Sequence, residues 1–326
     1  MNSLYPLKFE PIFKEKIWGG NRMKSLMPAE YDPPALCGEA WVLSGVGGST
    51  STVSNGFLAG NDLNEILEVY MYDLVGDAVY EKYGNEFPVL VKLIDANDWL
   101  SIQVHPDDEL AARRESGRGK TEMWYVLQAG ENAQLISGFN KKINREQYQL
   151  HLRDGSLPGI MNYEAVNKGD VFFIPAGRVH ALGPGILLAE IQETSDTTYR
   201  IYDWDRTDSQ GKSRDLHIEQ ALDAIDFAVH EKYRTDYPAA ENKSVRLAAC
   251  EHFTTNLITL NTYGMEKDYG SIDSFVALLC VDGEAKLLHR DGSDMLKTGE
   301  LLLLPATCDQ VSIHPHPRTR LLEIFI

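Results

Sequence analysis

An internal repeat constrains the fold of this 326-residue chain more than any other feature of its sequence. Residues 169–176 read Gly-Asp-Val-Phe-Phe-Ile-Pro-Ala, and residues 299–306 read Gly-Glu-Leu-Leu-Leu-Leu-Pro-Ala. Each segment is typical of a short buried strand that ends in a tight turn. A second matching pair of strands and turns lies upstream, at residues 125–131 and 277–284. Two related units of short strands joined by Gly and Pro turns predict an all-β dominated fold of two jelly-roll (cupin) units.

The first unit is the longer one because it carries insertions. The segment between Gly130 and Gly169 is longer than the one between Gly283 and Gly299, and amphipathic helical spacing within it predicts a helix at residues 144–153. The same spacing predicts covering helices in three further places, at residues 61–69, 77–83 and 107–115. We therefore expect a first domain at 1–240, a linker at 237–240 and a C-terminal jelly roll at 241–326.

The first unit also carries a row of polar side chains on a predicted strand. Ser101, Gln103 and His105 alternate with Ile and Val, so all three side chains share one face of that strand. Lys120 and Glu122 repeat the two-residue spacing just before the apolar run at 123–127. Imidazole, amide and carboxylate groups are a set that can bind a metal ion.

A further histidine, His180, follows the Pro-Ala-Gly turn that ends the repeated strand of the first unit. The corresponding position of the second unit is Gln310, and the position corresponding to Glu122 is Phe275. The second unit is therefore expected to carry no metal ligands. We expect the remaining histidines of that unit to be structural or exposed, namely His289, His314 and His316.

Charged residues in two other apolar strands are expected to face the same barrel mouth. Lys92 interrupts the apolar run at 89–94, and Glu190 lies in a run that leads through a polar loop to Arg200. A surface ion pair of Arg200 with Asp196 or Asp203 is the alternative interpretation.

Four segments, SIQVHPDD, GKTEMWYV, IPAGRVHAL and LLAEIQETSDTTYRIYDWDR, occur in the same order as in a known family. Over roughly residues 5–206, the chain resembles the type I mannose-6-phosphate isomerases, specifically their short bacterial form. The resemblance implies one catalytic zinc ion per chain. Its ligands would be Gln103, His105, Glu122 and His180.

The resemblance also implies a reaction, in which mannose 6-phosphate and fructose 6-phosphate interconvert through a cis-enediolate. This reaction needs a base, a positive group for the developing oxyanion and a clamp for the phosphate. Lys120 is the first candidate for the base and Glu190 the second, and Arg200 suits either the enediolate or the phosphate. The remaining candidates for substrate binding are Ser101, Lys92 and Trp18, although a core tryptophan is an equal interpretation of Trp18.

Composition limits the partners of the chain. With 48 acidic and 31 basic residues the net charge is −17, which argues against nucleic acid and anionic membranes as partners. The four scattered cysteines and the charged N-terminal segment indicate a cytoplasmic protein without disulfides or a signal peptide. We expect a phosphorylated hexose as substrate and a monomer or homodimer.

Two functions from other classes remain open. Two histidines and one carboxylate in a cupin also suit a non-haem Fe(II) oxygenase. Against this stand the fourth candidate ligand, Gln103, and a cationic set suited to phosphate, Lys92, Lys120 and Arg200. A sugar-binding double cupin without catalysis is the other alternative, which an isomerase assay separates from the enzyme.

Overall fold

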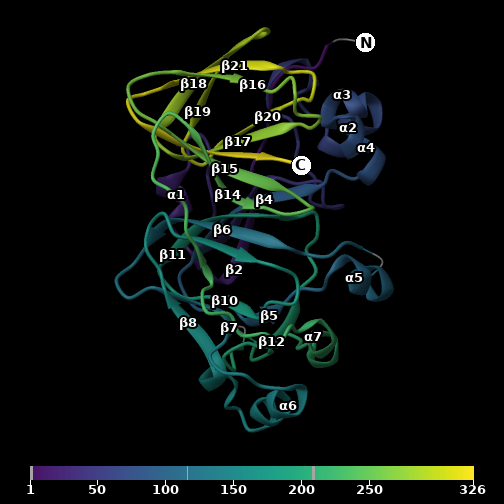
Figure 1. Cartoon of the computed structure of the whole chain (residues 1–326), viewed down its shortest axis with the longest axis vertical. Helices are drawn as coiled ribbons and strands as arrows, with labels where there is room; N and C mark the ends of the chain where they lie inside the picture. Colours follow the sequence, from purple (N-terminus) through teal and green to yellow (C-terminus); the bar gives the residue numbers. More distant parts are fainter. Residues whose placement is uncertain (1–2, 116, 208–209) are drawn as a thin grey trace.

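A computed structural model describes residues 3–115, 117–207 and 210–326 of the chain. Its described residues form four antiparallel sheets, two in each unit, with short helices outside them. The prediction of an all-β dominated fold with two jelly-roll units and a few covering helices is confirmed. In Figure 1 the C-terminal unit lies above the first unit, and helices α2, α3 and α4 lie together at one side.

The first unit consists of a seven-stranded and a five-stranded sheet. In spatial order, the seven-stranded sheet contains β13 (Arg234–Thr235), β9 (Val171–Ile174), β6 (Glu122–Ala129), β11 (Ile186–Glu193), β4 (Val89–Ala96), β2 (Ile12–Gly20) and β3 (Cys37–Leu43). The five-stranded sheet contains β12 (Tyr199–Tyr202), β5 (Ile102–Val104), β10 (His180–Leu182), β7 (Gln134–Phe139) and β8 (Met161–Ala165).

The C-terminal unit repeats this arrangement in a shorter form. Its six-stranded sheet contains β1 (Leu7–Lys8), β20 (Leu301–Leu304), β17 (Val276–Asp282), β22 (Thr319–Phe325), β15 (Thr254–Leu260) and β14 (Ser244–Ala249). Its four-stranded sheet contains β16 (Met265–Asp268), β21 (Gln310–Pro315), β18 (Glu284–His289) and β19 (Gly292–Lys297). The repeated strands pair alike, β9 with β6 and β20 with β17. Strand β1, from the N-terminal segment, pairs with β20 at the edge of the C-terminal unit.

Helices occur where the sequence predicts them. The four predicted helices are α2 (Leu63–Tyr70), α4 (Asp77–Tyr83), α5 (Asp108–Arg114) and α6 (Arg145–Arg153). Asp62 caps α2 through a reciprocal capping box with Glu65, and Asn144 does the same for α6 with Gln147. The other short helices are α1 (Met23–Leu26), α3 (Tyr72–Val75), α7 (Ile218–Ala224) and the 3₁₀ turns η1 (Gly56–Leu58) and η2 (Leu157–Ile160).

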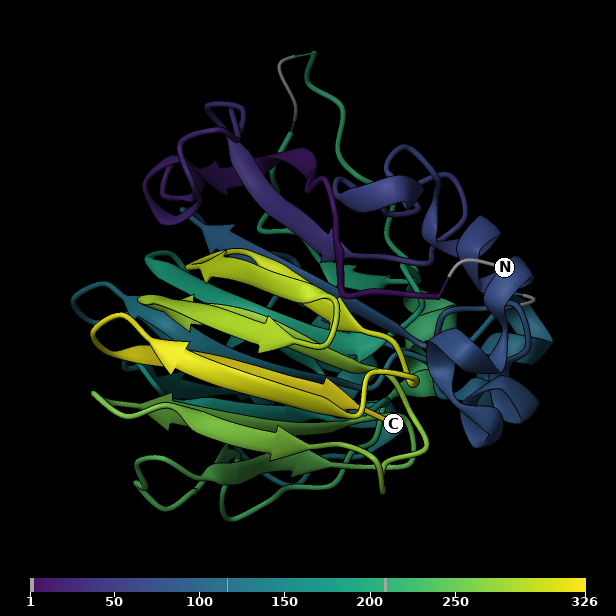
Figure 2. The ribbon, with the colours of Figure 1, turned by 90° about the horizontal axis from the view of Figure 1, so that it is seen from above.

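The seven-stranded sheet has a different environment on each face. On β6, Met123 and Tyr125 pack in a core that also contains Phe275 and Leu279 of the C-terminal unit. Trp124, between them, points to the opposite face and packs in the interior of the first unit. Figure 2 shows the strands of the C-terminal unit lying over those of the first unit. The two units therefore share one continuous core, and the division at residue 240 stays a prediction.

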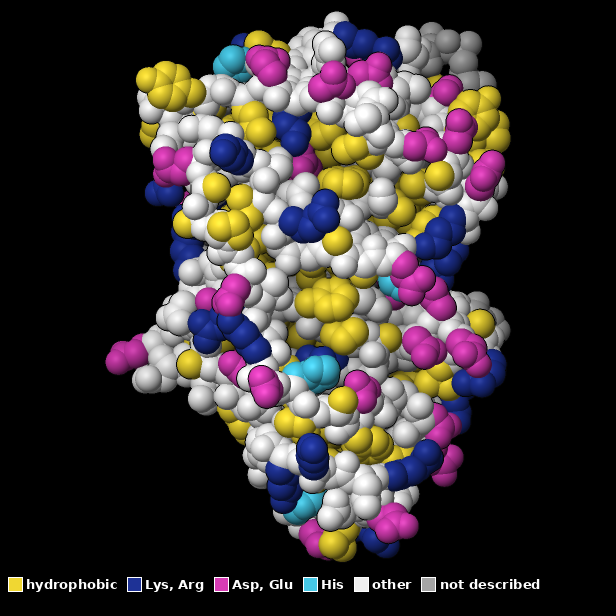
Figure 3. Space-filling view, viewed as in Figure 1, with side chains coloured by type: hydrophobic (Ala, Val, Ile, Leu, Met, Phe, Trp, Pro, Cys, Tyr) yellow, Lys and Arg dark blue, Asp and Glu magenta, His cyan; other side chains and the backbone are white. Residues whose placement is uncertain are grey.

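The surface and the cysteines agree with the composition. On the face shown in Figure 3, acidic and basic side chains are interspersed rather than gathered into one basic patch. All four cysteines are free thiols. Within the described part of the chain, no helix combines the length and the apolar character that crossing a membrane requires.

Candidate active site

A cavity of about 270 Å³ opens into the barrel of the first unit. Alternation along the central strands places its polar lining: Lys92 on β4 lies directly opposite Glu190 on β11, and Glu190 lies opposite Trp124 on β6. Every predicted site residue lines this cavity except His105 and Glu122, which are 1% and 0% exposed. The structure therefore brings the whole predicted set together.

Three potential metal ligands converge in the interior of the barrel. The ligand atoms of His105, Glu122 and His180 all lie within 4.8 Å of one another. Nε2 of His105 lies 3.5 Å from Glu122 Oε2, and Nε2 of His180 lies 3.4 Å from Glu122 Oε1. His105 Nε2 and both Glu122 oxygens are buried without a hydrogen-bond partner. Buried polar atoms normally have partners, so this donor set fits a metal ion.

The other ring nitrogen of each histidine is bound to backbone. His105 Nδ1 lies 2.9 Å from Thr197 O, and His180 Nδ1 lies 2.8 Å from Arg178 O. A carbonyl accepts a hydrogen bond, so Nδ1 carries the proton and Nε2 keeps its lone pair. This is the arrangement by which proteins orient histidine ligands toward a metal.

Gln103 lies beside this cluster. It pairs with His180 across β5 and β10, and its Nε2 lies 3.2 Å from His180 Nε2. Amide oxygen and nitrogen positions are assigned from hydrogen bonding, and half a turn of the amide would direct Oε1 toward the cluster. Gln103 therefore fits the fourth position.

Burial shifts the proton affinities of this cluster. It holds the pKa of His105 well below its ordinary value and lowers the pKa of His180 to about 4. Burial, together with the charge of Glu190, raises the pKa of Glu122 to about 8. Neutral imidazoles are the form that binds metals, and a metal cation beside Glu122 would stabilise its charged form.

Glu190 is firmly held in its charged form. Its Oε1 accepts a 3.0 Å hydrogen bond from Lys92 Nζ, and its Oε2 accepts a 2.9 Å bond from Trp124 Nε1. Burial raises the pKa of Glu190, but the charges of Lys92 and Lys120 and these hydrogen bonds outweigh it, so the net shift is downward. Lys92 Nζ also donates to Gln192 Oε1 at 2.6 Å. Lys92 is therefore held by two residues of the adjacent strand β11, Glu190 and Gln192.

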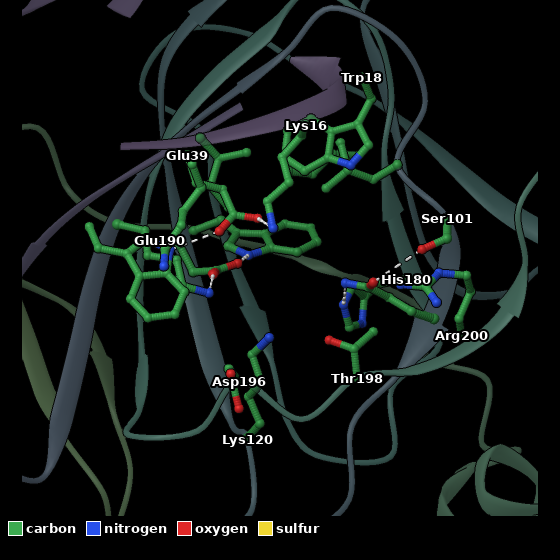
Figure 4. A pocket seen from close by; sticks show the side chains of 18 of the residues that line it. Lys16, Trp18, Glu39, Ser101, Lys120, His180, Glu190, Asp196, Thr198 and Arg200 are labelled. Carbon is green, nitrogen blue, oxygen red and sulfur yellow. Dashed lines mark hydrogen bonds and ion pairs between the residues drawn. The ribbon is translucent and has the colours of Figure 1, made fainter. Parts of the chain in front are cut away.

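Lys120 projects into the cavity with fewer partners. Its ammonium lies 3.8 Å from Glu122 Oε2, and the residue is 5% exposed. Burial and the nearby charge of Lys92 lower the pKa of Lys120. Figure 4 shows Lys120 between the side of the cavity that carries Glu190 and the side that carries His180.

Arg200 lies on the wall opposite Glu190, near His180 and Ser101 (Figure 4). Its Nη1 donates to the backbone oxygen of Asp215 at 2.8 Å. No carboxylate of the described residues lies within the 4.0 Å ion-pair distance of Arg200, because Asp203 is paired with Arg206 and Arg214 instead. The alternative interpretation, a surface ion pair, does not occur, and the guanidinium remains available to an anion.

Comparison with known proteins places the chain in one family. Residues 6–133 match the family model of the type I phosphomannose isomerase catalytic domain. The mannose-6-phosphate isomerase ManA of Bacillus subtilis is 34% identical over 303 residues, 92% of this chain and 93% of the relative. The chain belongs to the type I phosphomannose isomerases.

Other members of the family agree. The mannose-6-phosphate isomerase of Streptococcus mutans is 41% identical over 225 residues, 68% of this chain and 67% of that protein. The crystal structure of the mannose 6-phosphate isomerase from Bacillus subtilis superposes with a TM-score of 0.88 at 31% identity, covering 98% of this chain and 99% of that one. Type I phosphomannose isomerases are metal-dependent, and the resemblance inferred from the four sequence segments is confirmed.

Part of the cavity wall of this phosphomannose isomerase was not predicted from its sequence. Lys14 and Lys16 line the cavity from β2 together with the predicted Trp18, and Glu39 and Trp41 line it from β3. The residues within each strand are two positions apart and therefore share a face. That alternation was available in the sequence and would have found them.

The C-terminal unit behaves differently at the matching positions. Phe275 is fully buried and Gln310 is exposed. His289 contacts Asp294 at 2.9 Å, and His314 contacts the hydroxyl of Ser312 at 2.8 Å. In the described chain, neither histidine belongs to a cluster of three metal-ligating side chains, and the same holds for His316.

Proposed function

We propose that this phosphomannose isomerase uses one catalytic zinc ion per chain to interconvert mannose 6-phosphate and fructose 6-phosphate through a cis-enediolate. The observation that carries the proposal is the convergence of two imidazoles and a carboxylate, with orphaned ligand atoms, beside a cavity lined by cations. The free cysteines support a cytoplasmic location.

The metal would be held by Gln103, His105, Glu122 and His180. Two imidazole nitrogens and carboxylate and amide oxygens suit Zn²⁺, and such catalytic sites leave a position open for substrate or water. A bound zinc ion supplies Lewis acidity toward the oxygens on C1 and C2 of the open-chain sugar.

Lys120 is the proposed base that moves the proton between C1 and C2. A cis-enediolate allows one base on one side of the sugar to remove the proton and return it to the neighbouring carbon. Both oxygens of Glu190 already accept hydrogen bonds, whereas Lys120 Nζ has an ion-pair contact of 3.8 Å and faces the cavity. Glu190 is therefore the second candidate, and its charge would act on the cations around it.

The substrate phosphate would bind on the side of Arg200. Arg200 has no carboxylate partner among the described residues, and a guanidinium is suited to planar recognition of phosphate oxygens. Ser101 and Trp18 would contact the sugar. Lys92, which also lines the cavity, would act mainly by holding Glu190 and Gln192 in place.

The test is Lys120→Met, which keeps most of the buried stem and removes the amine. We expect metal content and mannose 6-phosphate binding close to wild type, and turnover at least about 100-fold lower, because general-base catalysis contributes about 10²–10⁴. Exchange of the C2 proton with solvent deuterium, followed by NMR, measures the step directly.

Lys14→Met is the matched control, since Lys14 lies in the same cavity wall and its amine binds the hydroxyl of Ser49. It should exchange the C2 proton within about tenfold of wild type. If Lys120→Met exchanges the C2 proton at the wild-type rate, Lys120 is not the base, and Glu190 becomes the candidate to test. Failure of the metal-loaded wild type to isomerise mannose 6-phosphate would overturn the proposed function as a whole.

A further inference from the structure

A second cluster of metal-ligating side chains lies where the C-terminal unit meets the first unit. It contains Asp108, the first residue of α5, Glu193, the last residue of β11, and His252, from the loop between β14 and β15. Their ligand atoms lie within 4.8 Å of one another. None of the three lines the catalytic cavity, so the cluster is separate from the site described above.

Glu193 is the buried centre of this cluster. It is 2% exposed, and its Oε1 accepts a 2.6 Å hydrogen bond from the backbone N–H of Thr121. Its Oε2 has no hydrogen-bond partner, although Nδ1 of His252 lies 3.1 Å away. An orphaned carboxylate oxygen in the interior is rare and here faces two other ligand groups.

The charges around the cluster do not balance. Asp108 and Glu193 bring two carboxylates together, and no Lys or Arg of the described chain pairs with either of them. The nearby cations are engaged elsewhere, Arg118 with Glu86 and Lys82 with the backbone oxygen of Glu251. A divalent cation would neutralise the two carboxylates and give Glu193 Oε2 its missing partner.

We propose that Asp108, Glu193 and His252 form a second, non-catalytic site for a divalent transition-metal ion. One imidazole nitrogen and two carboxylate oxygens favour Zn²⁺ or Mn²⁺ over the all-oxygen preference of Mg²⁺ and Ca²⁺. Asp108 is exposed, so the ion enters from solvent and keeps water in its remaining positions.

This site would fasten the C-terminal unit to the segments that carry the catalytic ligands. Asp108 stands three residues after His105, and Glu193 binds the backbone of Thr121, the neighbour of Glu122. His252 belongs to the C-terminal unit, for which the repeat positions predict no metal ligands. The proposed site lies outside those repeat positions and departs from that prediction.

Metal stoichiometry tests the proposal. The full-length chain is stripped with a chelator and titrated with Zn²⁺ against a chromophoric competitor. We expect two equivalents for wild type and one for His252→Ala and for Asp108→Asn, an exposed and nearly isosteric change. His180→Ala should also bind one equivalent, and Zn²⁺ should raise its melting temperature only while His252 is present.

His289→Ala is the control, because His289 contacts Asp294 in the same unit outside this cluster. It should bind two equivalents and turn over within about threefold of wild type. Binding of one equivalent by wild type, or of two by both His252→Ala and Asp108→Asn, overturns the second site. Neither result affects the catalytic assignment, which depends on the variants of His105 and His180.

Discussion

Arg22 should be a position outside the catalytic cavity at which substitution strongly lowers stability. Its Nε and its backbone N–H each donate to the carboxylate of Asp95 at 2.7 Å, and Asp95 is fully buried. The rest of the guanidinium binds the backbone oxygens of Ala96, Gly185 and Ile186. One side chain therefore joins the segment after β2 to β4 and to the start of β11.

Replacing Arg22 by Met leaves the Asp95 carboxylate buried without its counter-charge. Loss of one partner of a buried ion pair costs about 3–5 kcal/mol. Arg22→Met should therefore lower the free energy of unfolding by about 3–5 kcal/mol.

Urea denaturation followed by tryptophan fluorescence at pH 7 measures this loss of stability. Lys24→Met is the matched control, because Lys24 is 74% exposed and faces Asp32 at 4.0 Å, and it should change stability by less than about 0.5 kcal/mol. The double variant Arg22→Met, Asp95→Asn should recover about half of the loss, since it removes the unpaired charge. An Arg22→Met variant that loses less than about 1 kcal/mol would refute the role of this ion pair.

Two further predictions concern the catalytic site. Chelation should abolish activity, and zinc should restore it. His105→Ala and His180→Ala should lose the catalytic metal, whereas Gln103→Ala should retain more of it because an amide is the weakest donor. Metal analysis combined with turnover measurements checks this, and full turnover of His180→Ala would contradict it. Arg200→Lys should raise KM for mannose 6-phosphate about tenfold or more with metal content unchanged, because an ammonium cannot make a bidentate contact with the phosphate. Unchanged KM and kcat values would show that Arg200 does not bind the substrate.

The features that could be predicted are those that depend on short, local sequence patterns. The polar row of Ser101, Gln103 and His105 has a period of two, which assigns one face of a strand regardless of the rest of the fold. The repeated strands likewise carry their own turn signals, and they pair as β9 with β6 and as β20 with β17. The helices that begin after Asp62 and Asn144 can be located from capping boxes, each contained within four residues.

The unpredicted part depends on pairing between distant segments. Arg22 meets Asp95 only because β2 and β4 lie in one sheet, and His252 meets Glu193 only because the two units pack together. In the sequence, Arg22 and His252 are isolated residues, and many carboxylates along the chain could pair with either of them. No local sequence pattern indicates which carboxylate the fold brings next to each one.

The two faces of the central sheet explain why a unit that lacks ligands at the repeat positions belongs to this fold. On β6, Glu122 and Trp124 point into the interior of the first unit, while Met123 and Tyr125 pack in the core shared with the C-terminal unit. Strand β11 is divided in the same way, with Glu190 inside and Ala189 and Ile191 in the shared core. A strand packed on its outer face cannot shift without disturbing that core, so this packing fixes the positions of the candidate site residues on its inner face. We therefore expect the C-terminal unit to support catalysis by limiting the movement of the strands that carry the candidate site residues.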